Sequence, residues 1–332
     1  MNIAEKEAAL VRLGQYLAGN SPEWEVVKER AYIANGWFIP AFINNALENI
    51  CQYFLEPAKL QQWLQSYPAV TADRTPRKVG IVAAGNIPLV GFHDWLCGFI
   101  SGHQVKLKLS GKDEILMKHI LSKMEEWYPE TAGQTEVLDM LKDCEAYIAT
   151  GSNNSARYFN YYFAKYPHII RHNRTSAAVL TGKETPAELE ALADDIMLYF
   201  GLGCRNVTKI FVPRDYNFQP LLDALNKYSY LMDHHKYKNN YDYNLALLLL
   251  NNSPYITNGT LLLHEAESLF SPLSVLNYGY YDDIQELAAS LHQDEVLQCL
   301  VGKDFIPFGY AQQPALQEYA DGVDTMAFLL GI

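Results

Sequence analysis

The chain has 332 residues, of which 49 % are hydrophobic and 19 % charged, enough apolar side chains to bury the cores of one or two domains. Its formal net charge of -12 disfavours nucleic acid and anionic membranes as partners, because their phosphates would be repelled. The five cysteines are odd in number and lack CxxC spacing, which disfavours a disulfide framework or a zinc ribbon.

The first residues lack the apolar core of a signal peptide, and no apolar run is long enough to span a bilayer. The run Leu245–Leu250 is expected to be a buried strand or helix segment. We therefore expect a cytoplasmic protein without stable membrane insertion.

The N-terminal segment, residues 1–75, is predicted to be helical. Leu10, Leu13 and Leu17 recur with helical spacing, and Ser21 followed by Pro22 is typical of a cap and the first residue of a second helix. The polar, proline-containing residues 71–77 indicate a linker.

Strands and helices alternate from residue 76 onward. The expected strands are 79–84, 104–109, 145–150, 168–171 and 177–180. The expected helices between them are 89–100, 115–127 and 156–166. Strands separated by helices of this length predict an α/β fold with a parallel sheet, and such a sheet binds ligands at the carboxyl ends of its strands.

The alternation starts again after residue 184. A helix at 188–200, a loop at 201–206, a strand at 207–212 and a helix at 220–228 are expected. The polar and aromatic segment Tyr237–Asn244 is predicted to be an exposed loop.

Cys204 is the strongest candidate for chemistry. It follows Gly203 in a glycine-containing loop between a helix and a strand, and it precedes Arg205. Glycines allow close approach of a ligand, and a neighbouring cation favours the nucleophilic thiolate. A buried cysteine beside a turn is the alternative, because free cysteines are usually core residues. Cys97 and Cys299 lie in apolar patterns that predict core helices.

Three further segments lie where predicted strands end. Asn86, after Gly85, could donate a hydrogen bond to an oxyanion or cap a helix. Lys108 and Ser110 end the next strand, where a lysine either meets a nucleotide or stays solvated. Gly151 and Ser152 open a helix that could hold a pyrophosphate or carry an ordinary cap.

Histidine is a common metal ligand, and four histidines bear on whether a metal site is expected. They are not spaced with carboxylates as metal ligands are, so no metal site is expected. These residues are His93, His172, His234 and His235.

Taken in order, these segments resemble the aldehyde dehydrogenase superfamily. Its members carry asparagine-x-proline, lysine-x-serine, glycine-serine and a catalytic cysteine in the same succession. Segments 201–209 and 319–326 look like those of a narrower group, the Lux-type long-chain fatty acyl-CoA reductases. The resemblance runs from about Lys78 to the C-terminus.

The resemblance implies an aldehyde-dehydrogenase-like α/β fold with a Rossmann-type cofactor domain, an α/β catalytic domain and a helical N-terminal segment. In that plan the chain leaves the cofactor domain near Leu180 and returns to it near Ser271. The implied boundaries are 1–75 for the helical segment, 76–182 with about 271–305 for the discontinuous cofactor-binding domain, 183–270 for the catalytic domain and 306–332 for a C-terminal segment.

The resemblance also implies an activity, the NADPH-dependent reduction of a fatty acyl thioester (acyl-CoA) to an aldehyde through an acyl-cysteine on Cys204. NADH is the second cofactor to consider. Asn86 and the Cys204 backbone N–H would form the oxyanion hole. Lys108 and Ser110 would hold the adenosine ribose or phosphate, and Ser152, after Gly151, would contact the pyrophosphate. An acyl-activating enzyme and further copies of this chain are the candidate protein partners.

Two departures from the superfamily pattern bear on the reaction. The glutamate general base should fall near His172–Arg174, where no carboxylate occurs. Ser268 occupies the position at which the superfamily often has a glutamate that holds the nicotinamide ribose. The nearest glutamate, Glu267, is one residue away.

Two other functions stay open. One is an aldehyde-oxidising NAD(P)-dependent dehydrogenase on the same fold. The other is a non-catalytic partner of an acyl-activating enzyme, against which the intact set of Asn86, Lys108 and Cys204 argues.

Overall fold

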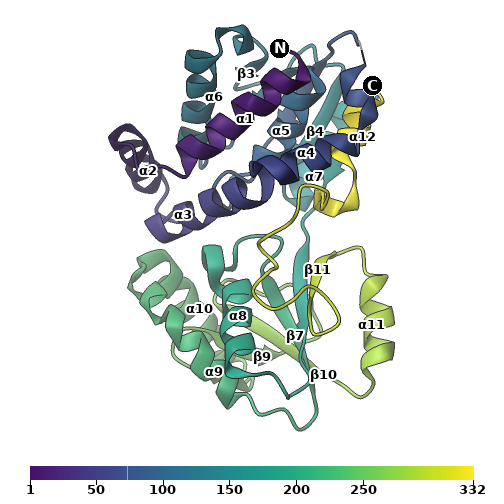
Figure 1. Cartoon of the computed structure of the whole chain (residues 1–332). Helices are drawn as coiled ribbons and strands as arrows, with labels where there is room; N and C mark the ends of the chain where they lie inside the picture. Colours follow the sequence, from purple (N-terminus) through teal and green to yellow (C-terminus); the bar gives the residue numbers. More distant parts are fainter. Residues whose placement is uncertain (73) are drawn as a thin grey trace. The chain divides into compact units, whose positions relative to one another are not determined.

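The computed structural model describes residues 1–72 and 74–332, and the chain forms two compact units. Unit 1 comprises Met1–Asn173 and Pro314–Ile332, and unit 2 comprises Arg174–Gln313. Each unit contains one β-sheet with helices packed on it (Figure 1). Within the described residues, no helix combines the length and apolar character that a membrane crossing requires.

Unit 1 begins with a helical segment, as predicted. Its helices are α1 (Ile3–Leu17), α2 (Pro22–Ala34), α3 (Pro40–Asn49), which continues as a π-helical turn, and α4 (Pro57–Gln65). Asn2 and Glu5 form a capping box at α1, and Ser21 caps α2 ahead of the proline. The predicted linker 71–77 includes residue 73, which lies outside the described residues.

The sheet of unit 1 has five parallel strands in the order β3-β2-β1-β4-β5. Its elements are β1 (Lys78–Val82), α5 (Phe92–Ser101), β2 (Gln104–Lys108), α6 (Ile115–Trp127), β3 (Thr135–Val137), β4 (Ala146–Thr150), α7 (Asn153–Phe163) and β5 (His168–Arg171). The chain moves outward from β1 to β2 and β3, and then crosses to β4 on the other side of β1. Between β1 and β4 the direction of winding therefore reverses, which is where open α/β sheets bind ligands.

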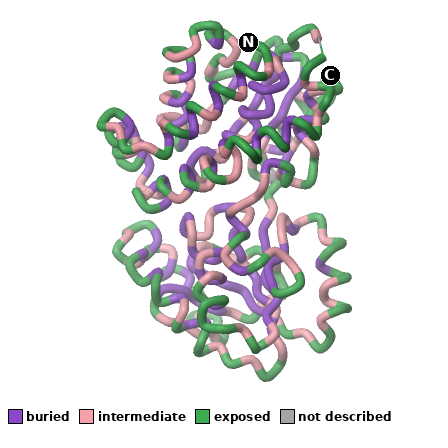
Figure 2. Tube along the Cα trace, viewed as in Figure 1, coloured by how far each residue is buried: buried purple, intermediate pink, exposed green. Residues whose placement is uncertain are grey.

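Helix α5 is buried in the core of unit 1, where it packs against the sheet and the C-terminal helix. Gly98 lets it approach β2 closely, since a Cβ atom there would lie 2.6 Å from Val105 Cγ2. Helix α12 (Thr325–Leu330) packs against α5, and the Trp63 indole donates to the Tyr319 hydroxyl at 2.8 Å. Residues 314–332 therefore belong to unit 1, whereas 306–313 of the expected C-terminal segment belong to unit 2. Figure 2 shows the buried residues of this unit running through the sheet and α5.

Unit 2 contains a six-stranded sheet in the order β11-β6-β7-β10-β9-β8, parallel except for the β8–β9 pair. Its elements are β6 (Thr175–Val179), α8 (Pro186–Met197), β7 (Val207–Pro213), α9 (Gln219–Leu225), α10 (His235–Leu250), β8 (Tyr255–Thr257), β9 (Leu262–Glu265), β10 (Val275–Tyr281), α11 (Ile284–His292) and β11 (Leu297–Gly302). Figure 1 shows α8 and α9 on one side of this sheet and α11 on the other.

The strands divide the chain differently from the boundaries implied by the resemblance. Range 271–305 was expected to join 76–182, but β10 pairs with β7 and β11 pairs with β6, both in the second sheet. β6 itself lies before the expected boundary at 182, yet it also belongs to unit 2. The pairing between strands determines which sheet a segment joins. The sequence could not show this, because strands and helices alternate in the same way on both sides of the boundary.

The prediction of an exposed loop at Tyr237–Asn244 is wrong, because this segment lies in α10. Tyr237, Tyr241 and Asn244 recur at helical spacing and form the buried face of the helix. The run Leu245–Leu250 is the end of the same helix, and it is not buried throughout: Leu249 is 57 % and Leu250 79 % exposed.

The two cysteines predicted to lie in core helices differ. Cys97 is fully buried in α5, as predicted. Cys299 lies on strand β11 and not in a helix, and its side chain is half-buried. Its neighbours Leu297, Leu300 and Val301 suit either element, so their apolar character did not distinguish them.

Candidate active site

Cys204 is half-buried in a turn between a 3-10 turn (Leu198–Gly201) and β7. Asn206 shapes this turn. Its backbone N–H donates to the Gly203 carbonyl at 3.1 Å, and its Oδ1 accepts the Gly203 N–H at 2.8 Å. Its side-chain NH2 donates to the carbonyls of Asp195 at 3.1 Å and Leu198 at 2.9 Å. The fully buried Asn206 therefore joins the cysteine turn to the end of α8.

The backbone immediately before the turn is strained. Tyr199, Phe200 and Gly201 have consecutive positive φ angles of 55°, 58° and 76°. A left-handed conformation costs roughly 1–2 kcal/mol for each non-glycine residue. Tyr199 and Phe200 are held in it by burial of both side chains. Such strain is common at functional sites, where the surrounding structure compensates for it.

A buried carboxylate supports the same region. Asp195 accepts the backbone N–H of Gly309 at 2.7 Å and of Ala311 at 3.0 Å, and the Arg205 guanidinium donates to the Ala311 carbonyl at 3.1 Å. Burial raises the pKa of Asp195 to about 7, although these hydrogen bonds oppose the shift. Residues on both sides of Cys204 are thus attached to segment 309–311.

A second thiol lies near the cysteine turn. The Ser176 hydroxyl donates to the Cys204 carbonyl at 3.0 Å and lies 3.0 Å from the Cys299 sulfur. Burial raises the pKa of Cys299, which keeps this thiol protonated at neutral pH. A thiol in this state is a poor nucleophile.

The turn after β1 carries Asn86 as an exposed residue. Gly85 before it is in close contact with the loop after β2, since a Cβ atom at Gly85 would lie 2.5 Å from Ser110 Oγ. Lys108, at the carboxyl end of β2, is exposed, and its carbonyl accepts the Ala83 N–H at 3.0 Å. Asn86, Lys108 and Ser110 thus lie on two adjoining segments, as the parallel sheet predicts.

Gly151 and Ser152 lie between β4 and α7. Ser152 Oγ accepts the Ser155 N–H at 3.3 Å and caps the helix. A Cβ atom at Gly151 would lie 2.9 Å from the Ser155 Cβ, so only glycine allows this close approach. The helix N-terminus therefore lies beside the position where the winding of the sheet reverses, and its first backbone N–H groups suit an anion.

The six predicted site residues fall into two sets. Asn86, Lys108, Ser110, Gly151 and Ser152 follow neighbouring strands of unit 1, whereas Cys204 belongs to unit 2. Segment His172–Arg174 contains no carboxylate. Arg171 just before it donates to the Asp94 carboxylate and, at 2.8 Å, to Thr325 Oγ1 inside unit 1.

Ser268 and Glu267 lie at the place of the superfamily's ribose-binding glutamate. The Ser268 hydroxyl donates to the Phe270 carbonyl at 2.8 Å, and Glu267 is exposed. Among residues 1–72 and 74–332, no cluster of three or more His, Cys, Asp or Glu side chains could hold a metal ion.

A pocket of about 620 Å³ opens on the sheet of unit 2, lined by residues that include Lys209, Phe211 and Tyr280. Lys209 donates to the carbonyls of Ala266 and, at 2.9 Å, of Tyr278, and burial lowers its pKa. None of the six predicted site residues lines this pocket.

Sequence reasoning missed several polar residues that support these turns, above all Asn206, Asp195 and Asp113. Asp195 was detectable as a carboxylate on the apolar side of a helix, next to Ile196 and Met197. Asp113 and Asn206 had no such signal, because Asp and Asn are ordinary residues in loops.

Comparisons with known proteins give the family and the fold of the chain. Residues 35–221 match the model of the acyl-CoA reductase (LuxC) family, a range that includes all six predicted site residues. A search of curated protein sequences found no match.

Solved structures with a similar fold include several aldehyde dehydrogenases. The aldehyde dehydrogenase of Mycobacterium tuberculosis, complexed with NAD+, has a TM-score of 0.66 at 15 % identity over 91 % of this chain and 73 % of its own. Aldehyde dehydrogenase 21 of Physcomitrella patens, in complex with succinate, has a TM-score of 0.65 at 13 % identity over 94 % and 76 %. The indole-3-acetaldehyde dehydrogenase of P. syringae has a TM-score of 0.64 at 13 % identity over 87 % and 69 %.

Proposed function

Since the chain belongs to the acyl-CoA reductase (LuxC) family, we propose that it reduces a fatty acyl thioester to an aldehyde, with Cys204 as the nucleophile. The observation that carries this proposal is the position of Cys204 and Asn86 inside the matched range, each on a turn that the surrounding residues shape. The chain is accordingly an oxidoreductase with an aldehyde-dehydrogenase-like fold.

The first half of the proposed reaction transfers the acyl group. The Cys204 thiolate attacks the thioester carbonyl carbon, a C–S bond forms, and the carbonyl π electrons move to oxygen. The Cys204 backbone N–H is one donor to this oxyanion, and the Asn86 amide is the second donor that the resemblance to aldehyde dehydrogenases implies. When the carbonyl re-forms, the bond to the CoA sulfur breaks, and CoA leaves as a thiolate that takes up a proton. The product on the chain is an acyl-cysteine.

A nicotinamide cofactor, when bound, supplies hydride to the acyl carbon. In unit 1 the residues that would hold it are Lys108 and Ser110 after β2, and Gly151 with Ser152 at the N-terminus of α7. An exposed ammonium at a strand end and the amides of a helix N-terminus suit the phosphates of a dinucleotide. The M. tuberculosis relative is complexed with NAD+, and we propose NADPH for this chain, with NADH as the alternative.

The last step belongs to Cys204. After reduction the hydroxyl proton of the thiohemiacetal is lost to water, the oxygen electrons form the carbonyl of the aldehyde, and the C–S bond breaks to regenerate the Cys204 thiolate. Water would compete by hydrolysing the acyl-cysteine, but fast hydrolysis of a thioester needs a general base. The lack of a carboxylate at His172–Arg174 supports reduction over oxidation.

The test is incubation of the protein with acyl-CoAs of graded chain length and NADPH, followed by absorbance of the reduced cofactor and detection of aldehyde. We expect loss of NADPH with one aldehyde formed per acyl-CoA consumed. The aldehyde-oxidising alternative would instead give free acid from aldehyde and NADP without CoA. A thioester delivered by an acyl-activating enzyme is the other donor to be compared in the same assay.

A further inference from the structure

We propose that Asp113 is a positioning residue that holds the Asn86 turn against the Lys108–Ser110 loop, so that the oxyanion donor and the cofactor contacts keep one fixed arrangement. This inference rests on the proposed function for the roles of Asn86 and Lys108. The contacts of Asp113 themselves lie entirely within unit 1.

The Asp113 carboxylate binds the chain immediately after the Asn86 turn. Its Oδ2 accepts the Leu89 N–H at 2.7 Å, and the Val90 backbone also donates to this carboxylate. Leu89 has a left-handed φ of 58°, a conformation that a leucine adopts only when other contacts enforce it. The carboxylate therefore fixes the backbone three residues beyond Asn86.

Asp113 also belongs to the loop that follows Lys108. Its backbone N–H donates to the Ser110 carbonyl at 2.9 Å, and the Lys112 N–H donates to Ser110 Oγ at 3.3 Å. The two segments touch directly, because a Cβ atom at Gly85 would lie 2.5 Å from Ser110 Oγ and 3.3 Å from Asp113 Cβ. Movement of either segment would thus displace the other.

The position of Asp113 indicates that its carboxylate acts on the neighbouring turn and not on its own helix. Helix α6 begins two residues later with Glu114 as its N-cap residue, and no side-chain capping hydrogen bond occurs there among the described residues. The N-terminal helices also contact the loop that carries Asp113. The Asn35 side chain, at the end of α2, donates to the Lys112 carbonyl at 3.1 Å.

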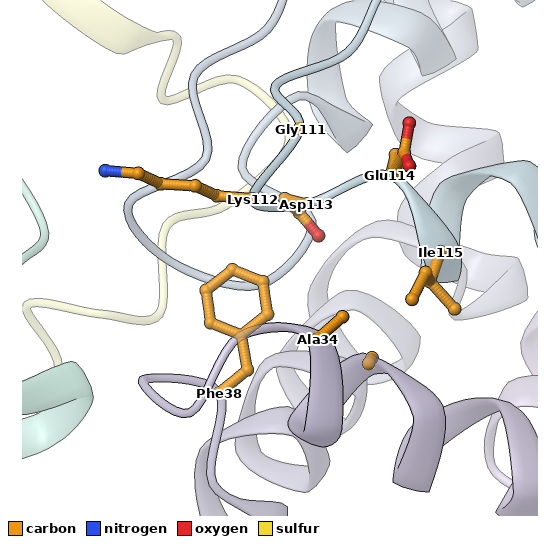
Figure 3. Close-up of a pocket in the computed structure, with 8 residues that line it drawn as sticks. Ala34, Phe38, Gly111, Lys112, Asp113, Glu114 and Ile115 are labelled. Carbon is orange, nitrogen blue, oxygen red and sulfur yellow. The ribbon is translucent and has the colours of Figure 1, made fainter.

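Asp113 is only 6 % exposed and lines a small pocket of about 30 Å³ with Ala34 and Phe38. Figure 3 shows its carboxyl group pointing into this pocket, whereas Lys112 and Glu114 point away. Its Oδ1 has no hydrogen-bond partner among the described residues, and burial raises its pKa to about 7. Removing a carboxyl group from water is unfavourable. The hydrogen bonds from the backbone N–H groups of Leu89 and Val90 offset this cost, which explains why the group is buried here.

The test compares Asp113→Ala with Asp113→Asn. Asparagine keeps an oxygen that can accept the Leu89 and Val90 N–H groups, whereas alanine removes it. Glu114→Ala is the matched control, because this neighbouring carboxylate pairs with Lys118 on the surface. Three quantities are measured: the rate of acyl-adduct formation by intact mass, the Kd for NADPH by fluorescence titration, and hydrogen exchange of residues 83–92.

We expect Asp113→Ala to slow acylation roughly tenfold or more, to weaken NADPH binding severalfold and to speed exchange in 83–92, since small displacements of a positioned group are costly. Asp113→Asn should stay within about threefold of the wild type in all three measurements. Wild-type behaviour of Asp113→Ala, or equal losses in the folded Asp113→Asn, would overturn the proposal. If the alanine variant does not fold, Asp113→Ser takes its place, because its hydroxyl is too short to reach Leu89.

The two proposals fail in different ways. If the wild-type protein forms no acyl adduct, the proposed function is wrong. The exchange measurement still decides on Asp113, because it needs neither substrate nor cofactor. Unchanged exchange of residues 83–92 in the alanine variant would reject the positioning role even if the enzyme is an acyl-CoA reductase.

Discussion

The Ser176 hydroxyl donates a 3.0 Å hydrogen bond to the Cys204 carbonyl, and the same oxygen lies 3.0 Å from the Cys299 sulfur. The backbone of Cys204 and the thiol of Cys299 therefore contact the same serine. Cys204 lies on a turn, whereas Cys299 lies on β11, where partial burial raises the pKa of its thiol. This difference allows the nucleophile to be tested against a nearby control.

Cys204→Ala should abolish reduction and leave the fold intact, because a half-buried turn position tolerates truncation. Intact-mass measurement with acyl-CoA and without NADPH should show an acyl adduct on the wild type and on Cys299→Ala, but not on Cys204→Ala. An adduct that persists in Cys204→Ala would reject this residue as the nucleophile.

Asn86→Ala should lower the turnover number by roughly a hundredfold or more, the usual effect of losing an oxyanion donor. The loss should appear in single-turnover acylation, where the thioester reaction itself is observed. Asn206→Ala is a useful contrast, because it removes the support of the Cys204 turn and should lower the melting temperature as well. If the turnover number of Asn86→Ala is unchanged, Asn86 is a structural residue and not an oxyanion donor.

Lys108→Ala should raise the KM for NADPH far more than the KM for acyl-CoA, since under the proposed function it removes a contact to the cofactor alone. Lys106→Ala is the matched control on the same strand, where the lysine pairs with Glu136. Steady-state kinetics with each substrate varied in turn distinguish the two. Equal increases in both KM values would show that Lys108 does not contact the nucleotide.

The direction of the reaction is tested at Asn173, which is exposed and follows His172. With fatty aldehyde and NADP but no CoA, the wild type should form little free acid, because His172–Arg174 carries no carboxylate to activate water. Added CoA should restore oxidation by reversing the reduction. Asn173→Glu should increase acid formation at the expense of aldehyde, whereas Asn173→Gln should not. Rapid CoA-independent acid production by the wild type would favour an aldehyde-oxidising dehydrogenase.

Asp195 predicts a pH dependence of stability. Burial raises its pKa from 3.8 to about 7 on folding, so the folded state binds more protons between these values. Stability should therefore fall as the pH rises from about 4 to about 7, by on the order of a few kcal/mol for this group. Asp195→Asn should remove this pH-dependent contribution to stability. The difference in melting temperature between the wild type and the variant should therefore shrink as the pH rises from about 4 to about 7. A difference that is constant or grows with pH would contradict this account.

The local sequence was sufficient for much of the scaffold. The apolar run of β1, the amphipathic pattern of α6 and the cap at Ser21 are each encoded within a few residues, because side-chain spacing and capping are local properties. The order of strand ends along the chain was likewise enough to expect Asn86, Lys108 and Ser152 at one edge of a parallel sheet. The same reasoning failed at α10, where tyrosines and asparagines concealed a helical pattern.

Tertiary structure alone decided which sheet each strand joins and which isolated polar residues are buried. β10 pairs with β7 although about sixty residues separate them, and Asp113 binds Leu89 across two segments. These choices depend on contacts between residues far apart in the chain, whose energies no local window contains. For the same reason Asn206 and Asp113 look like ordinary loop residues in the sequence, and only folding gives them their partners.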